Sequence, residues 1–103
     1  MAAQLIAMYK KPADAVAFDR YYTTTHVPLA KKIPGLRRYE VSTGAVMTPQ
    51  GESGYHLVAL LHFDSADAIG GALGTPDGAA AAADLANFAQ AGVDLFIVDT
   101  RDI

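Results

Sequence analysis

The chain has 103 residues, of which 51% are hydrophobic, and its formal net charge is −3. This length predicts a single small domain over residues 1–103, and the hydrophobic content is too high for a disordered protein. The sequence contains no cysteine, which excludes disulfides, thiolate zinc sites and thiol catalysis. Basic residues cluster only as separated pairs, so no nucleic-acid-binding surface is expected.

Apolar residues are spread evenly along the sequence, and no apolar run approaches the ~18 residues of a spanning helix. The N-terminus lacks the basic region and apolar core of a signal peptide. These features predict a cytoplasmic protein without membrane contact.

The start of the chain predicts a strand followed by an interrupted helix. Residues 3–9 form a short, nearly continuous apolar run, which is typical of a strand buried on both faces. Asp14 can cap a helix that runs to about residue 25, and Pro28 should break or kink that helix near His26. A second short helical piece is expected over residues 29–33.

The rest of the chain alternates apolar runs with glycine, proline and capping residues. Ser65 and Thr75 stand where helices should begin, and Gly74 and Gly92 where they should end. The predicted elements are a strand over residues 36–46, a loop at 48–54 short enough for a hairpin connection, a strand over 55–63, helices over 66–73 and 76–91, and a strand over 93–99.

The order β-α-β-β-α-β is that of the ferredoxin-like α+β fold, a four-stranded antiparallel sheet with both helices on one face. The strands over residues 3–9 and 55–63 are apolar on both faces, yet the helices can cover only one face of the sheet. The other face would be a large apolar patch, which usually marks an interface. We therefore expect a homodimer in which two sheets face each other and close a barrel across a two-fold axis.

His26 lies where an amphipathic helix should carry a hydrophobic residue. Spacings of three and four residues place it on one stripe with Phe18, Tyr22, Leu29 and Ile33. The side chain should therefore point inward, and an imidazole can exchange protons with a substrate near neutral pH. The alternative is a core histidine that hydrogen-bonds to a backbone carbonyl or a tyrosine hydroxyl.

Tyrosines accompany this histidine. Tyr22 precedes it by four residues, so the two rings can stack or hydrogen-bond, and Tyr22 and Tyr39 can orient a substrate oxygen. The structural alternative is that the tyrosines only wedge the helix against the sheet. Asp84 lies on a helical stripe with Phe88 and could orient an imidazole, but a partly solvated position on the flank of the helix is the favoured interpretation for an aspartate.

Two further histidines lie in the predicted strand over residues 55–63. Strict alternation places His56 and His62 on one face, about 20 Å apart at ~3.3 Å per residue, which excludes a shared metal ion. Either histidine could face a substrate pocket, and solvent near the strand end is the favoured expectation for His62. His56 and Phe18 are the candidates for the lining of that pocket. No metal or cofactor site is predicted, and haem ligation by His26 is disfavoured because no second ligand accompanies it.

Several short motifs are spread over nearly the whole chain: Tyr9-Lys10-Lys11-Pro12, Phe18 with Tyr21-Tyr22, His26-Val27-Pro28-Leu29, Ile33-Pro34-Gly35-Leu36-Arg37-Arg38-Tyr39, Phe63-Asp64-Ser65 and Asp84-Leu85-Ala86-Asn87-Phe88. In this combination the sequence resembles the EthD family, named for ethyl tert-butyl ether degradation, within the dimeric α+β barrel superfamily. The resemblance implies a ferredoxin-like fold, a homodimer and a pocket between sheet and helices. The activities that it implies are varied: auxiliaries of ether degradation, lactone isomerases, polyketide cyclases or dehydratases, and cofactor-free oxygenases.

These observations predict a cofactor-free enzyme of the isomerase, lyase, cyclase or oxygenase type, acting by proton transfer on a hydrophobic aromatic or lactone-like metabolite. His26 would be the general acid/base and Tyr22 its catalytic partner, while Tyr39, Phe18 and His56 would bind the substrate. Two alternatives stay open: a carrier that binds a small ligand without catalysis, and an accessory protein of a degradative oxygenase. A histidine with one ring nitrogen open to a cavity would favour catalysis.

Overall fold

Four strands form one antiparallel sheet in the computed structural model, which describes residues 2–103. They are β1 (Ala2–Lys10), β2 (Arg38–Val41), β5 (Tyr55–Phe63) and β6 (Val93–Thr100), in the order β2-β5-β1-β6 across the sheet. The long strands β1 and β5 pair in the centre, from Ala3 opposite Phe63 to Lys10 opposite Tyr55. The predicted ferredoxin-like fold is confirmed.

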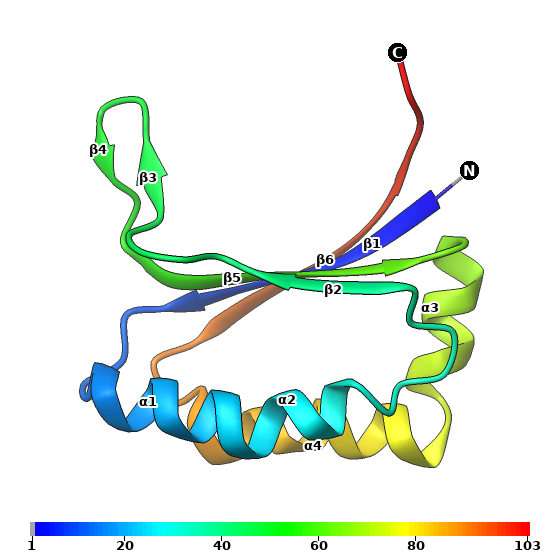
Figure 1. The fold of residues 1–103 in the computed structure, drawn as a ribbon, viewed down its shortest axis with the longest axis horizontal. Helices are drawn as coiled ribbons and strands as arrows, with labels where there is room; N and C mark the ends of the chain where they lie inside the picture. Colours follow the sequence, from blue (N-terminus) through cyan, green and yellow to red (C-terminus); the bar gives the residue numbers. More distant parts are fainter. Residues whose placement is uncertain (1) are drawn as a thin grey trace.

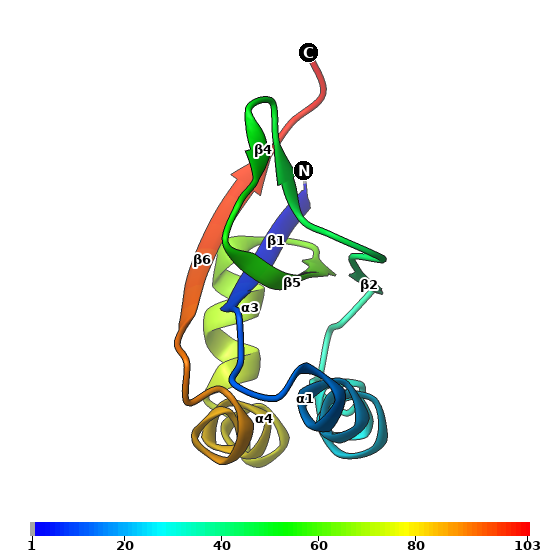
Figure 2. The ribbon, with the colours of Figure 1, turned by 90° about the vertical axis from the view of Figure 1, so that its left-hand side faces the viewer.

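The helices lie on one face of this sheet (Figure 1). They are α1 (Ala15–Tyr21), the π-helix η1 (Tyr22–His26), α2 (Val27–Ala30), α3 (Ala66–Leu73) and α4 (Pro76–Phe88). The first three follow one another without interruption and form one rod, which runs beside α4, while α3 packs against β1 and α4 (Figure 2). We call the sheet face toward the helices the inner face and the opposite face the outer face.

Side-chain caps begin the helices where the sequence predicts them. Asp14, Ser65 and Thr75 each accept a hydrogen bond from the backbone N–H three residues later, at 3.0–3.1 Å. Such a bond satisfies one of the free donors of the first helical turn. Local sequence therefore determines where α1, α3 and α4 begin.

The predicted disturbance of the first helix near His26 is present as a π turn, but the helix does not break there. The backbone instead widens into η1, in which the N–H of Val27 donates to the carbonyl oxygen of Tyr22. Pro28 has no N–H to continue an α-helical ladder, and a π turn is a common way to accommodate such a local irregularity. After the wider turn Ala30 is the buried residue, whereas Leu29, expected on the buried stripe, is only partly buried.

The second strand is shorter than predicted. It ends at Val41, and the chain turns away through Gly44, whose φ of 72° suits glycine. It then forms a hairpin of β3 (Met47–Thr48) and β4 (Gly51–Glu52). This hairpin projects beyond the sheet on the side opposite the helices (Figures 1 and 2).

A β-bulge at the start of β5 changes which side chains face the helices. Tyr9 pairs with Leu57 and Lys10 with Tyr55, so that His56 is the additional residue between them. A bulge of this kind redirects a side chain to the other face of a sheet. His56 accordingly lies on the inner face, where its ring is 5.1 Å from that of Phe18. The predicted placement of His56 and His62 on one face is therefore wrong.

The core fills the space between the inner face and the helices, and its aromatic members include Tyr9, Phe18, Phe63 and Phe88. Across the outer face, the strand registers place six apolar side chains together: Ile6, Met8, Val58, Leu60, Phe96 and Val98. We call these six residues the outer apolar strip. Within residues 2–103, no helix has the length and apolar character required to cross a membrane.

Candidate functional site

His26 occupies the last position of the π-helix and points into the core, as its spacing predicts. The residue is only 6% exposed. Its ring centroid lies 5.3 Å from that of Tyr22 and 4.7 Å from that of Phe88 on α4. The imidazole thus packs against two neighbouring aromatic rings, which restrict its orientation.

Asp84 on α4 holds one nitrogen of this imidazole. Its Oδ2 lies 2.9 Å from Nδ1 of His26, and its Oδ1 accepts hydrogen bonds from the hydroxyl of Tyr21 at 2.6 Å and from Nδ2 of Asn87 at 3.0 Å. Asp84 is 6% exposed, so the favoured expectation of a partly solvated flank is wrong. An aspartate is buried when hydrogen-bond donors satisfy its charge, and here three side chains do so.

These hydrogen bonds keep Asp84 ionised. Burial by itself would raise the pKa of its carboxyl group. The hydrogen bonds from Tyr21, Asn87 and His26 outweigh that effect and hold the pKa of Asp84 below its ordinary value. The imidazole therefore lies beside a permanent negative charge at neutral pH. In the neutral ring, that charge favours the tautomer with the proton on Nδ1 and a lone pair on Nε2.

The second ring nitrogen of His26 is free to meet a ligand. Nε2 has no hydrogen-bond partner among residues 2–103. Every fully buried side-chain nitrogen or oxygen in these residues has a partner, so Nε2 must keep some accessible surface. His26 lines a cavity of about 80 Å³ between the inner face and the helices. The rest of its wall is mainly apolar and includes Leu5, Ala7, Ile33, Ala59, Leu61 and Leu85.

Two tyrosine hydroxyls meet beside this cavity. The hydroxyl oxygens of Tyr22 and Tyr39 are 2.5 Å apart, and both residues line the cavity with His26. Tyr22 therefore contacts the His26 ring but directs its hydroxyl to β2, not to the imidazole. Desolvation by burial is the main cause that raises the pKa of both hydroxyl groups, so both are neutral at physiological pH. One of the two hydroxyl hydrogens forms the hydrogen bond between the tyrosines, so the second hydroxyl hydrogen is available to donate to a ligand oxygen.

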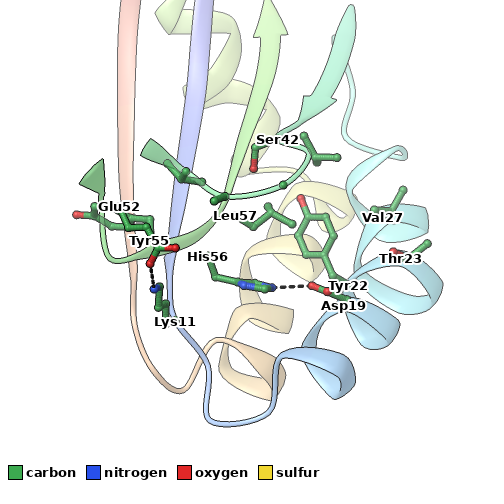
Figure 3. Close-up of a pocket in the computed structure, with 14 residues that line it drawn as sticks. Lys11, Asp19, Tyr22, Thr23, Val27, Ser42, Glu52, Tyr55, His56 and Leu57 are labelled. Carbon is green, nitrogen blue, oxygen red and sulfur yellow. Dashed lines mark hydrogen bonds and ion pairs between the residues drawn. The ribbon is translucent and has the colours of Figure 1, made fainter. Parts of the chain in front are cut away.

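A larger open cleft adjoins the other side of Tyr22 (Figure 3). We call it the outer cleft because it is open to solvent; it lies beside the helical rod and not on the outer face of the sheet. Its volume is about 590 Å³, within the range of small-molecule sites. The α1–η1 rod, the segment after β2 and the start of β5 form its walls (Figure 3). Nε2 of His56 lies 2.7 Å from Oδ1 of Asp19 in this cleft, and Nζ of Lys11 lies 3.0 Å from Oε2 of Glu52 near its edge. Tyr22 lines both spaces.

The residues singled out from the sequence thus separate into two groups around Tyr22. His26 and Tyr39 face the inner cavity, and His56 faces the outer cleft. Phe18 is 5% exposed and packs against Tyr22 and His56 as part of the core. It borders a separate surface groove between α1 and α4 but does not line the cavity or the cleft.

His62 lies on the outer face, away from both spaces. Its Nε2 is 2.7 Å from Oε1 of Glu40, and its side chain is 25% exposed. The expected position near the strand end is therefore correct, but the ring is only partly exposed because β2 brings a carboxylate beside it.

Sequence reasoning assigned no role in the site to three polar residues of these networks, namely Asp19, Tyr21 and Asn87. Asn87 follows Asp84 by three residues, a spacing that places two side chains together on a helix, and this signal was present in the sequence. Asp19 and Tyr21 bond to residues 37 and 63 positions away. No local sequence pattern predicts hydrogen bonds between residues so far apart in the chain.

Comparison with known proteins gives a consistent picture. The model of the EthD domain family matches residues 10–92. An uncharacterised 11.0 kDa protein of Rhodococcus erythropolis, encoded in the thcB–thcC intergenic region, is 38% identical over 96 residues, which cover 93% of this chain and 92% of that protein. The crystal structure of an EthD family protein from Bacillus halodurans is 37% identical and superposes with a TM-score of 0.89, covering 98% of this chain and 100% of that one.

More distant solved structures share the fold alone. A hydroxynitrile lyase from Passiflora edulis has 11% identity and a TM-score of 0.74, with 99% of this chain and 95% of that chain covered. The cofactor-independent oxygenase SnoaB from Streptomyces nogalater has 13% identity and a TM-score of 0.69 at the same coverage of 99% and 95%. A dimeric ferredoxin-like protein of unknown function from Thermobifida fusca has 20% identity and a TM-score of 0.70, with coverage of 97% and 92%.

Proposed function

Because this chain belongs to the EthD domain family, we propose that it is a cofactor-free enzyme acting by proton transfer on a small, hydrophobic, aromatic or lactone-like metabolite. The reaction is of the isomerase, lyase, cyclase or oxygenase type. His26 is the general acid/base, Tyr22 and Tyr39 orient the substrate oxygen, and His56 binds the substrate from the outer cleft. Phe18, which is expected from the sequence to bind the substrate, instead packs against the ring of Tyr22 and supports it.

The observation that carries this proposal is the asymmetry of the His26 ring. Nδ1 lies 2.9 Å from the Asp84 carboxylate, whereas Nε2 has no partner among residues 2–103 and the residue lines the cavity. A ring held in this way presents a lone pair to the substrate. When Nε2 takes a proton from the substrate, the resulting imidazolium is stabilised by the adjacent carboxylate. The same proton then returns from Nε2 to another atom of the intermediate.

Loss of a proton next to a carbonyl group, or from a phenol, leaves negative charge on the substrate oxygen. A donor placed at that oxygen stabilises the charge as it develops. The Tyr22–Tyr39 pair supports this role because its oxygens are 2.5 Å apart and one hydroxyl hydrogen is left free to donate. The mainly apolar wall of the cavity favours a hydrophobic substrate and strengthens such a hydrogen bond.

The size of the two spaces supports entry of the substrate from the open cleft. The inner cavity of about 80 Å³ has room only for part of a metabolite, whereas the outer cleft of about 590 Å³ can take the rest. Tyr22 lines both, so a ligand that reaches His26 from the cleft passes this side chain. His56 would contact the part of the ligand that remains in the cleft.

The proposed enzyme is a homodimer formed through the outer face. The outer apolar strip contains six apolar side chains and includes Phe96, which is 50% exposed. Two hydrogen-bonded polar pairs, Tyr55 with Asp94 and His62 with Glu40, occupy opposite ends of β5 on this face. An apolar centre with satisfied polar groups at its edge is the usual anatomy of a protein interface.

The proposal is tested with a panel of phenols, lactones and polyketide-like aromatic compounds, assayed in parallel for turnover and for binding. His26→Gln should lower turnover by roughly 10²–10⁴-fold, the usual contribution of a positioned acid/base. Tyr22→Phe should lower it less, because the ring remains. Circular dichroism and light scattering must show that both variants keep their fold and assembly.

His62→Gln is the matched control, since it removes an imidazole from the outer face and should keep turnover. If the native protein binds panel compounds but consumes none of them, the protein is a carrier and the proposed enzyme is rejected. Full turnover by the His26→Gln variant would discard the mechanism.

A further inference from the structure

Tyr21 and Asn87 lie on the far side of the Asp84 carboxylate from His26. Both line a surface groove of about 550 Å³ between α1 and the end of α4, and neither lines the inner cavity or the outer cleft. A ligand in those two spaces therefore meets neither residue. Their hydrogen bonds nevertheless end on the carboxylate that holds the imidazole.

The two donors differ in burial but share one acceptor atom. The hydroxyl of Tyr21 donates to Oδ1 of Asp84 at 2.6 Å, and Nδ2 of Asn87 donates to the same oxygen at 3.0 Å. The other oxygen, Oδ2, remains for Nδ1 of His26 at 2.9 Å. This division of the two carboxylate oxygens fixes the rotation of the Asp84 side chain and directs Oδ2 at the ring.

From this arrangement we infer that Tyr21 and Asn87 are positioning residues, which set the tautomer and the basicity of His26 through Asp84. Each hydrogen bond to Oδ1 withdraws part of the carboxylate charge from the imidazole. The native ring is therefore a weaker base than it would be beside an Asp84 with fewer donors. The inference rests on the acid/base role proposed above for His26, and it adds a means of adjusting that role from outside the substrate site.

Among residues 2–103, no charged side chain other than His26 itself lines the inner cavity. The titratable side chains that face the inner cavity with His26 are Tyr22 from its own segment and Tyr9 and Tyr39 from the sheet. Burial is the main cause that raises the pKa of each of these three hydroxyl groups, so they carry no charge at physiological pH. Asp84, from α4, is the anion bonded to the ring.

The test is an NMR titration of the His26 ring nitrogens in the full chain, which requires no substrate. In its neutral form the native ring should show a protonated Nδ1 and an unprotonated Nε2. In Tyr21→Phe, the pH profile of the ring signals should move to higher pH by about 0.5–1 unit, because the carboxylate charge is less shared. Asn87→Ala should move the profile in the same direction by less, since the hydrogen bond from the Asn87 amide is longer than that from the Tyr21 hydroxyl. Asp84→Asn should move it to lower pH.

Tyr55→Phe is the matched control, because Tyr55 also donates to an aspartate, Asp94, at 2.6 Å but on the outer face. It should leave the His26 profile unchanged. Asn87 is exposed, so its variant provides a readout even if Tyr21→Phe fails to fold. Unchanged profiles in both Tyr21→Phe and Asn87→Ala, or an equal shift in Tyr55→Phe, would overturn the inference. A shifted profile in a protein that consumes no panel compound would instead leave the inference standing and reject the proposed enzyme.

Discussion

His26 and Asp84 are 58 residues apart in the chain, yet Nδ1 of the histidine and Oδ2 of the aspartate are 2.9 Å apart. One side chain comes from the π-helix and the other from α4, and each is 6% exposed. The pair thus joins two neighbouring helical segments that cover the inner face, η1 and α4. A carboxylate in this position orients the imidazole. Its contribution to the free energy of unfolding depends on pH, because it stabilises the fold only while it is ionised.

The first prediction concerns acid stability. The pKa of Asp84 is lowered in the folded protein, so its stabilising contribution is complete above the ordinary carboxyl pKa of about 3.9 and is lost as the pH falls below it. Asp84→Asn should lower the free energy of unfolding by about 1–3 kcal/mol at pH 7. The difference from the native protein should shrink as the pH falls below about 4. Urea unfolding across this range measures it, and a difference that stays constant with pH would contradict the assignment.

The second prediction uses two glycines of the helical layer. A Cβ atom at Gly78 would lie 1.9 Å from the carbonyl oxygen of Ala72, because α4 begins directly against the end of α3, whereas a Cβ at Gly71 meets nothing within 4 Å. Gly78→Ala should therefore destabilise the protein by about 1–3 kcal/mol or more, as overpacking does. Gly71→Ala, in the interior of α3, should stabilise it by up to about 1 kcal/mol. Thermal unfolding of both variants should show opposite signs.

The third prediction concerns the aromatic core beneath the cleft. Phe18 is 5% exposed and packs against the rings of Tyr9, Tyr22 and Phe88. Phe18→Ala should lower the free energy of unfolding by about 3–5 kcal/mol, as for other large-to-small core changes. Val16 on the same helix is 70% exposed, and Val16→Ala should change it by less than about 0.5 kcal/mol. A loss at Phe18 as small as that at Val16 would show that this ring is not packed.

The fourth prediction concerns alkaline pH. Burial is the main cause that raises the pKa of Tyr9, Tyr22 and Tyr39 above the ordinary value of about 10. Their contribution to stability is therefore complete below pH 10 and is lost as the pH rises further. Absorbance at the phenolate band should show these rings ionising together with unfolding, which circular dichroism follows. Reversible ionisation of every tyrosine near pH 10 in a protein that remains folded would contradict their burial.

The fifth prediction tests the proposed dimer. Leu60 lies within the outer apolar strip, opposite Ile6 on one side and Glu40 on the other. Leu60→Asp would place a charge in the proposed interface and should dissociate or unfold the protein. Val16→Asp is the control, since Val16 is 70% exposed on the helical side. Light scattering of the native chain at micromolar concentration gives the reference state, and a stable native monomer would reject the interface.

Local sequence was sufficient for most of the secondary structure. Asp14, Ser65 and Thr75 mark the helix starts because a side-chain cap acts within three residues. The helix over residues 66–73 and the strand over 55–63 have the predicted bounds. Spacing alone also placed His26 in the core, because helical periodicity converts residue number into direction. The β-α-β-β-α-β order then left few arrangements other than the ferredoxin-like fold.

The partners within the site were decided only when the layers packed. The Asp84 pair with His26 depends on how α4 lies beside the η1 segment, and the Tyr22 pair with Tyr39 depends on where β2 ends up relative to the helix. The inward direction of His56 depends on a bulge against β1, which reverses the alternation that its sequence predicts. Periodicity describes each element by itself, whereas register and helix packing are set by contacts between distant segments. This sequence therefore determined that His26 turns inward on its helix, and the tertiary structure decided which side chains it meets.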